Sequence, residues 1–399
     1  MSAVALSTHA TLRRLLDQAA AHAPVDLQGA ANPWPLGLVA LASLGAADAR
    51  LDEVAAEAAS LQDAAPPVDA WPAGEAWTQA LGDLDAWPAL RGLMREWLAQ
   101  EGAAAVLGQV LPRLWPGLAS AGFLGLVRTV TALEAGHAGE LADALAFWVC
   151  AYTALDEGVT LDDEDEADDD ADAASAADQD AADALADDLP GDEAAWPTQL
   201  PAVEPVIVLA LRAAAAGADL DELVSALVEQ AASHTGPTLD DLLEHLARDA
   251  ARRYLREGDM LVLRLLVAAQ SLRRLLDYIE ADAAEREAAL TEFTLAHAAT
   301  LLAVAMADAA LPAGAGEGEV DADPAAHEHL LDIARLAVAP RVDAGRRPLP
   351  TWAELRAAGV QRHDPELWLA LWACQAQDQA HDGPEWRLAA QRALEDEAG

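Results

Sequence analysis

An arginine and a threonine within an otherwise apolar segment are the side chains best placed for chemistry in this chain. Arg128 and Thr131 follow Leu124 at helical spacing, and residues three or four apart share one face of a helix. On such a face the pair could hold an anion or a carbonyl oxygen inside a pocket. An arginine in this setting could instead form a buried ion pair with one of the chain's many acids, and the sequence leaves both interpretations open.

Two further charged or titratable side chains interrupt apolar runs. His297 lies between Phe293 and Leu311, where an imidazole could move protons near neutral pH or serve as a structural core residue. Arg264 lies within the apolar run from Met260 to Ala269. It must find a partner or extend to solvent, so it either binds an acidic ligand in a cavity or forms an ion pair.

Asn32 and Trp368 also have two interpretations each. Asn32 precedes Pro33 and Trp34, so it could cap a helix that begins there without any role in a site. Trp368 and Trp372 are four residues apart and could line an aromatic pocket or pack in the core.

No metal, flavin, serine-hydrolase or dinucleotide signature is evident. The one Glu-x-x-His spacing that we considered for a helical metal site runs from Glu134 to His137, and Gly136 interrupts the helix there. No GxSxG motif occurs, and the GAGEGE run follows a helix rather than a strand.

The elements that position these residues should all be helices. The chain has 399 residues, of which 53% are hydrophobic but only 5% aromatic. Its apolar residues are mostly alanine and leucine, which favour helix over strand. We therefore predict an all-α fold, a single multi-helix domain of orthogonal or bundle-like packing.

Proline, glycine and apolar spacing set the expected helix limits. Residues 97–155 should form two or three short helices that are interrupted at Pro112, Pro116 and Gly136. Further helices are expected at 5–23, 36–44, 52–58, 205–215, 221–233, 238–255, 260–279, 283–311, 327–338, 351–358 and 364–379.

Residues 156–193 form a dense acidic run, which we predict to be a disordered insert because like charges oppose burial. A calcium loop is the alternative, but the sixth position from Asp162 or Asp163 is not the glycine that an EF-hand requires. Residues 1–155 and 194–399 should then be two halves of the same helical domain.

The formal net charge is −44, and all 24 basic residues are arginines. This charge argues against binding to nucleic acid or to an anionic membrane surface. The lack of lysine excludes a Schiff-base nucleophile and a Walker-type phosphate loop. Two isolated cysteines, no apolar leader and no membrane-length apolar run favour a cytoplasmic protein.

Four separated segments carry a family pattern. Asn32–Leu51 reads NPWPLGLVALASLGAADARL, and Leu111–Arg128 reads LPRLWPGLASAGFLGLVR. Arg253–Ile279 and Trp352–Cys374 follow in the same order. Together they resemble the questin oxidase-like family, whose patterns include "NHxPMxLxALxxLGA", "FHGLIR", "LHAVT" and "DxHVIKL".

The resemblance implies a helical fold and oxidoreductase activity. The named member of that family opens an anthraquinone ring by Baeyer–Villiger-type oxygen insertion with NADPH as reductant, so a polycyclic aromatic or similarly apolar substrate and NADPH are implied. We take Arg128 and His297 as catalytic candidates. The substrate-pocket candidates are Asn32, Leu124, Thr131, Arg264, Asp364, Glu366 and Trp368.

The chain departs from the family pattern at its histidines. Pro33, Leu124, Arg264 and Glu366 stand where the pattern has histidine, and Leu369 stands where it has lysine. If these are the active positions of the family, residues 33, 124, 264 and 366 should surround one cavity. A non-catalytic binding or scaffold protein on the same fold is the first alternative. A helical module whose acidic insert docks a basic partner is the second.

Overall fold

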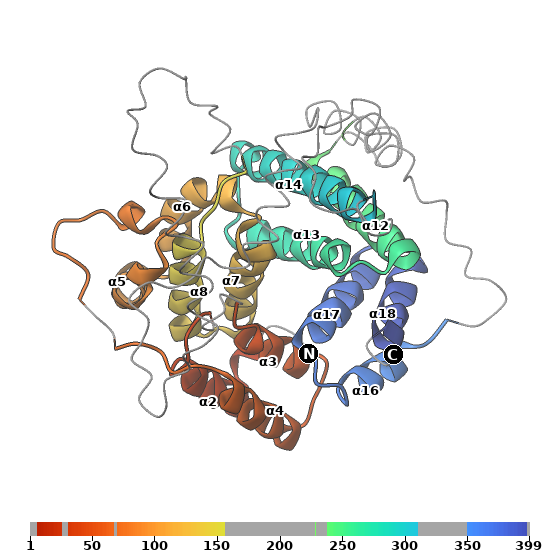
Figure 1. The fold of residues 1–399 in the computed structure, drawn as a ribbon, viewed down its shortest axis with the longest axis horizontal. Helices are drawn as coiled ribbons and strands as arrows, with labels where there is room; N and C mark the ends of the chain where they lie inside the picture. Colours follow the sequence, from red (N-terminus) through yellow and green to blue (C-terminus); the bar gives the residue numbers. More distant parts are fainter. Residues whose placement is uncertain are drawn as a thin grey trace, which may run out of the picture.

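A computed structural model of the chain describes residues 6–25, 31–67, 70–155, 228, 238–309 and 349–396. Within these ranges every regular element is a helix, and the only β-type pairings are two isolated bridges. The predicted all-α fold is confirmed (Figure 1).

The helices before the acidic run are α2 to α8. They span Ala10–Ala19 (α2), Trp34–Ser43 (α3), Asp48–Leu61 (α4), Trp87–Glu101 (α5), Ala103–Leu114 (α6), Leu124–Ala135 (α7) and Ala138–Cys150 (α8). Four short 3-10 helices join them at Trp77–Ala80 (η1), Leu84–Ala86 (η2), Trp115–Gly117 (η3) and Ser120–Phe123 (η4).

Six described helices follow the acidic run. They span Leu239–Glu257 (α12), Met260–Tyr278 (α13), Ala283–Ala309 (α14), Trp352–Gly359 (α16), Pro365–Ala380 (α17) and Glu385–Asp396 (α18). The expected helices at 205–215, 221–233 and 327–338, and the acidic run at 156–193, lie outside the described residues.

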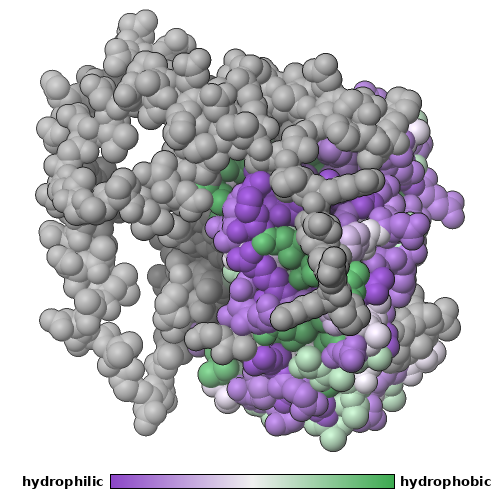
Figure 2. Space-filling model, turned by 90° about the vertical axis from the view of Figure 1, so that its right-hand side faces the viewer, coloured by the Kyte–Doolittle hydropathy of each residue, from purple (hydrophilic) through white to green (hydrophobic). Residues whose placement is uncertain are grey.

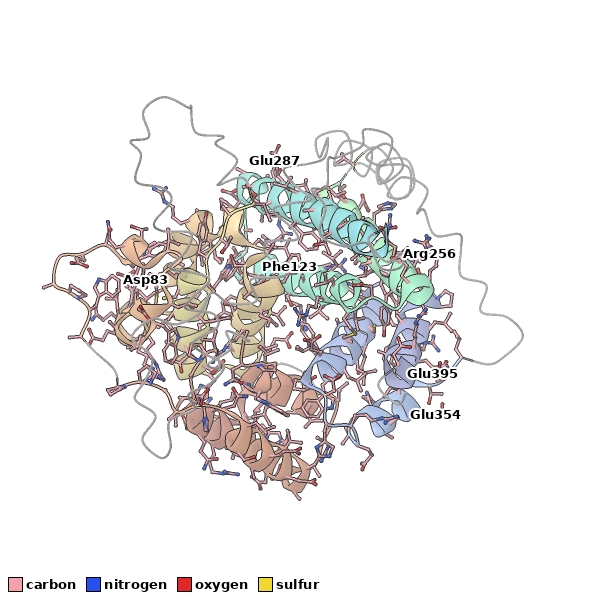
Figure 3. All side chains as sticks on the ribbon, in the orientation of Figure 1. Asp83, Phe123, Arg256, Glu287, Glu354 and Glu395 are labelled. Carbon is pink, nitrogen blue, oxygen red and sulfur yellow. The ribbon has the colours of Figure 1, made fainter. Side chains whose placement is uncertain are left out.

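Helices from both ends of the sequence share one core. Helix α7 packs against α8 on one side and α13 on the other, and α3 packs against α7 and α17 (Figure 1). Side chains fill the space between these helices, and Phe123 lies where α7 begins (Figure 3). Its ring meets Phe293 of α14 edge-on, with 6.3 Å between ring centroids. The start of α7 is therefore fixed by apolar contacts.

The part of the face that Figure 2 draws in colour is largely hydrophilic, with apolar side chains in separate patches. Met260 and Tyr278, at the two ends of α13, are among the few exposed large apolar residues that the structure describes. Most large apolar side chains of the described residues are buried in the core.

Local sequence signals set several helix starts close to the predicted positions. Thr238 and Thr351 each begin a helix with a capping box, in which the hydroxyl accepts the N–H three residues on. Asp259 and Asp364 cap α13 and α17 with a carboxylate oxygen that accepts the N–H groups two and three residues on. These caps explain why the predicted limits of the C-terminal helices agree with the structure within a few residues.

The break predicted at Pro112 is wrong. Pro112 lies inside α6, which continues to Leu114. A proline inside a helix has no N–H to donate to the carbonyl four residues earlier. In α6 that carbonyl belongs to Gly108, which is exposed and has no neighbouring atom within 4 Å of where its Cβ would be. Pro116 and Gly136 do interrupt the helices as predicted, in η3 and at the left-handed end of α7.

We predict that Gly125→Ala destabilises the fold. A Cβ at Gly125 would lie 2.6 Å from Cγ of Trp148, so α7 and α8 would have to separate. The free energy of unfolding in urea should fall by about 1–3 kcal/mol, as for other overpacked cores.

The matched control is Gly108→Ala, at an exposed helical glycine with no atom near its Cβ. It should raise the unfolding free energy by about 0.5–1 kcal/mol. Equal stability of the two variants would contradict the close packing of α7 on α8.

Candidate functional site

A small pocket lies where α7, α13 and α17 meet. Leu124, Arg264 and Glu366 line it together, although they are far apart in the sequence. Its free volume is about 20 Å³, which is space for roughly one water molecule. The other lining residues are Gly122, Val127, Met260, Leu263, Val267 and Leu369.

Three of the four positions expected to surround one cavity thus do so, and Leu369 joins them. Pro33 does not line this pocket. It lies at the N-cap of α3, and no residue of α3 lines the pocket.

An ion pair lines the pocket. Two guanidinium nitrogens of Arg264 donate to the Glu366 carboxylate, with Nε 3.4 Å from Oε2 and Nη2 on Oε1. The two side chains are 18% and 29% exposed, so solvent screens part of their attraction. Met260, at 42% exposed, marks where the pocket reaches the surface. The charged part of the lining is therefore partly exposed to solvent, and the rest of the lining is apolar.

A strained backbone turn places Leu124 in the pocket. Ala121, Gly122 and Phe123 have successive φ angles of 51°, 61° and 70°. Left-handed conformations are costly for alanine and phenylalanine, and they are typical of functional or tightly constrained segments. The turn ends at Leu124, the first residue of α7.

Three helices begin at this pocket. Leu124 opens α7, Glu366 lies in the first turn of α17, and Met260 opens α13. Helix N-termini carry partial positive charge, and α7 has no side-chain cap to offset it. Asp259 and Asp364 cap α13 and α17 with carboxylates. The uncapped start of α7 and the Arg264 guanidinium are therefore the groups here that favour a negatively polarised oxygen.

Comparison with protein families matches residues 31–323 to the family described as questin oxidase-like. The chain belongs to the questin oxidase-like family. No curated protein matches the chain. The family match ends before Trp352–Cys374, yet Glu366 from that segment completes the same pocket as Leu124 and Arg264.

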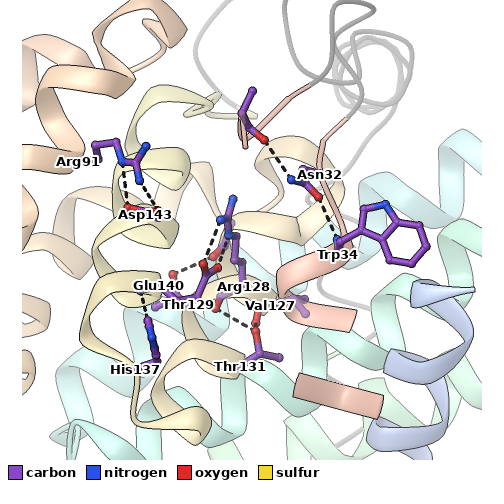
Figure 4. A network of polar contacts seen from close by, with 12 residues as sticks. Asn32, Trp34, Arg91, Val127, Arg128, Thr129, Thr131, His137, Glu140 and Asp143 are labelled. Carbon is purple, nitrogen blue, oxygen red and sulfur yellow. Dashed lines mark hydrogen bonds and ion pairs between the residues drawn. The ribbon is translucent and has the colours of Figure 1, made fainter. Parts of the chain in front are cut away.

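Arg128 lies outside this pocket of the questin oxidase-like protein. Its Nε donates to Oε1 of Glu140 at 2.6 Å, and both side chains are at most 5% exposed (Figure 4). Burial alone would lower the pKa of Arg128, but the Glu140 carboxylate outweighs burial and raises it. Thr131 donates its hydroxyl to the carbonyl of Val127, one turn back on α7. The ion-pair interpretation of Arg128 matches this geometry, although its Nη1 is buried without a hydrogen-bond partner.

A second buried ion pair lies beside the first. Asp143 of α8 accepts from Nε and Nη2 of Arg91 at 3.2 and 2.9 Å (Figure 4). It also accepts from Nη2 of Arg95 at 2.9 Å. His137 accepts the Glu140 N–H through Nδ1 and reaches Asp17 through Nε2 at 3.1 Å. Arginines of α5 and α7 are thus tied to carboxylates of α8.

Sequence reasoning missed Glu140 and Asp143. The available signal was their position inside the apolar run ELADALAFWVC, since acids in such a run need partners when buried.

His297 is fully buried and lies apart from the pocket. Its Nε2 is 3.4 Å from Oδ2 of Asp249 on α12, which also accepts from Arg253 at 2.7 Å. Burial would raise the pKa of Asp249, but Arg253 and His297 outweigh burial and lower it. The histidine therefore belongs to a buried polar cluster between α12 and α14, and its Nδ1 has no partner there.

The remaining candidates have contacts that hold the fold. Asn32 accepts the Trp34 N–H at 3.1 Å and donates to the Ala23 carbonyl at 3.1 Å. Asp364 accepts the N–H groups of Glu366 and Leu367 at the start of α17. Trp368 is fully buried and donates to the Gly359 carbonyl at 3.0 Å. None of the three lines the pocket.

The described ranges contain no group of three or more His, Cys, Asp or Glu arranged to hold a metal ion. None of the helices described is long and apolar enough to cross a membrane. Cys150 and Cys374 are free and buried, and burial raises the pKa of both thiols. A thiolate nucleophile is therefore disfavoured at either position.

We predict that Glu140→Gln strongly destabilises the protein, because it leaves the Arg128 charge buried and unpaired. The expected loss is about 3–5 kcal/mol of unfolding free energy, measured by urea denaturation. The double variant Arg128→Met/Glu140→Leu should recover most of it, since both charges are then absent.

Arg14→Met is the control, because the Arg14–Asp52 pair is about half exposed on both sides. It should change stability by less than about 1 kcal/mol. If Glu140→Gln cost no more than this control, the buried pair would not stabilise α7 on α8.

Proposed function

We propose that this questin oxidase-like protein is an oxidoreductase that acts on a polycyclic aromatic or similarly apolar ketone at the pocket between α7, α13 and α17. The observation that carries the proposal is the meeting of Leu124, Arg264 and Glu366 in one pocket from three separate segments. A strained turn and three helix starts converge on the same place, as is common at functional sites.

The overall reaction would be a Baeyer–Villiger-type oxygen insertion, as the family implies. One atom of O₂ enters the bond between the carbonyl carbon and its neighbour, giving an ester. The other atom leaves as water, and NADPH supplies the two electrons while a proton comes from solvent.

The residues of the pocket would bind and orient the ketone. Leu124, Leu263 and Leu369 offer apolar contact to a ring, and Arg264 can donate a hydrogen bond to the carbonyl oxygen. The ion pair must open to admit a ring, because the free volume is only about 20 Å³. Both side chains reach solvent, so Glu366 can turn outward when the substrate oxygen replaces it.

NADPH enters the proposal as the reductant that the overall reaction consumes. A nicotinamide ring, like the ketone, would need the ion pair to open, because the remaining space is about that of one water. A cytoplasmic location is part of the same proposal and is supported by the two unpaired cysteines.

A non-catalytic binding protein is the second candidate function. One observation favours it: Leu124, Arg264 and Glu366 occupy positions where the family pattern has histidine. The pocket then lacks an imidazole to move protons near neutral pH. Such a protein would bind the same apolar ligand without turnover.

The test follows NADPH and O₂ consumption with a hydroxylated anthraquinone as substrate. We predict turnover above the enzyme-free background, and Arg264→Met should lower kcat/KM by about 10- to 100-fold. That range corresponds to loss of a charged hydrogen bond worth about 1.5–3 kcal/mol.

Arg274→Met is the matched control. Arg274 lies on the same helix, is 49% exposed and pairs with Glu134 away from the pocket, so its loss should leave kcat/KM unchanged. Substrate binding without turnover in the unaltered protein would establish the second candidate. Turnover that is unaffected by Arg264→Met would place the chemistry elsewhere.

A further inference from the structure

A second and larger cavity lies between α2 and α4, beside the start of α3. Its volume is about 340 Å³, at the lower end of the roughly 300–1,000 Å³ of small-molecule pockets. It shares no lining residue with the pocket between α7, α13 and α17. We call it the α2–α4 cavity.

Small side chains create the space. Ala55 and Ala59 lie one turn apart on α4, and Ala19 faces them from α2. Leu15 and Leu38, both buried, complete the apolar lining. Alanine fills little volume, so two helices can remain in contact and still leave a hollow between them.

Trp34 gives the cavity one aromatic wall. Its ring is partly exposed and meets Trp368 edge-on, with 6.4 Å between centroids and 62° between planes. Asn32 uses both ends of its amide to hold the Trp34 N–H and the Ala23 carbonyl (Figure 4). Asn32 therefore positions Trp34, and an aromatic ligand would stack or pack on a fixed ring.

His22 is a polar residue of the α2–α4 cavity that has no part in the function proposed above. It lines the cavity, and its Nδ1 is buried without a hydrogen-bond partner. Backbone hydrogen bonds on both sides of it, from Ala23 to Asp63 and from Ala65 to Ala21, hold the loop in place. A buried nitrogen without a partner is costly, and a ligand group that hydrogen-bonds to it would remove that cost.

The charges at the cavity favour a neutral ligand. Arg14 and Asp52 pair at its rim and cancel each other. The whole chain carries a formal charge of −44, which repels anions. An apolar cavity with one aromatic wall, one imidazole and no net local charge matches a flat, uncharged ring system.

We propose that the α2–α4 cavity binds a neutral planar aromatic molecule of about two fused rings that carries one hydroxyl or N–H group. The rings lie between the alanines of α4 and Trp34, and the polar group is held by the imidazole of His22. This site is independent of the proposed oxidoreductase activity, because it uses none of the same residues.

Naphthol is the probe, since it is a two-ring phenol that is neutral at pH 7. Isothermal titration of the full chain should show saturable binding of one molecule. Ala55→Leu/Ala59→Leu fills the cavity and should weaken binding at least about tenfold, while leucine preserves the helix. His22→Phe keeps the ring shape but removes the nitrogens, and should weaken binding about fivefold or more.

Ala49→Leu is the matched control, because Ala49 lies on α4 outside the cavity. It should bind naphthol within about twofold of the unaltered chain, and melting temperatures check that every variant folds. Naphthoate, the anionic analogue, should bind at least about tenfold more weakly. No saturable naphthol binding, or equal binding by the double leucine variant, would overturn the site. Equal binding of naphthoate would overturn its ligand class.

Discussion

The buried pairing of Arg128 with Glu140 is the interaction on which the arrangement of the site depends. Removing two charges from water costs several kcal/mol, so the pair is tolerated only while the two groups stay in contact. Because Arg128 lies on α7 and Glu140 on α8, α7 cannot slide or rotate without exposing an unpaired charge to an apolar interior. The Arg91–Asp143 pair imposes the same condition between α5 and α8.

Fixing α7 fixes the pocket. Gly125 allows α7 to approach Trp148 of α8 more closely than any larger residue would permit. The left-handed turn at Ala121–Phe123 then sets where α7 begins, and the Phe123–Phe293 contact anchors that turn against α14. A strained segment persists only where surrounding packing determines its conformation, and here the packing comes from elements on both sides of the acidic run.

The sequence predicted what local chemistry determines. Helix starts at Thr238, Asp259 and Asp364 follow from capping side chains that lie within three residues of the groups they satisfy. The pairing of Arg264 with Glu366 joins positions 102 residues apart, and no local rule links them. Only the family resemblance predicted that Arg264 and Glu366 would share a cavity with Leu124. Arg128 and His297 are candidates because each is a polar residue within an apolar run. Such a residue can belong to a functional site or to a buried ion pair, and the sequence pattern is the same in both cases.

The two cavities differ in width and in their lining. The pocket at the helix starts is narrow and is lined by the Arg264–Glu366 pair, whereas the α2–α4 cavity is wide and has the Arg14–Asp52 pair in its lining. Helix α3 lines the larger cavity and packs against α7 and α17, two of the helices that form the smaller pocket. Trp34 lines the larger cavity, and Gly37, one turn further on, lies so close to Pro365 that a Cβ would come within 2.8 Å of its side chain. Since Pro365 opens α17, the position of Glu366 is set by how closely α3 packs, and a glycine in α3 is what allows α17 to bring its first turn to the pocket.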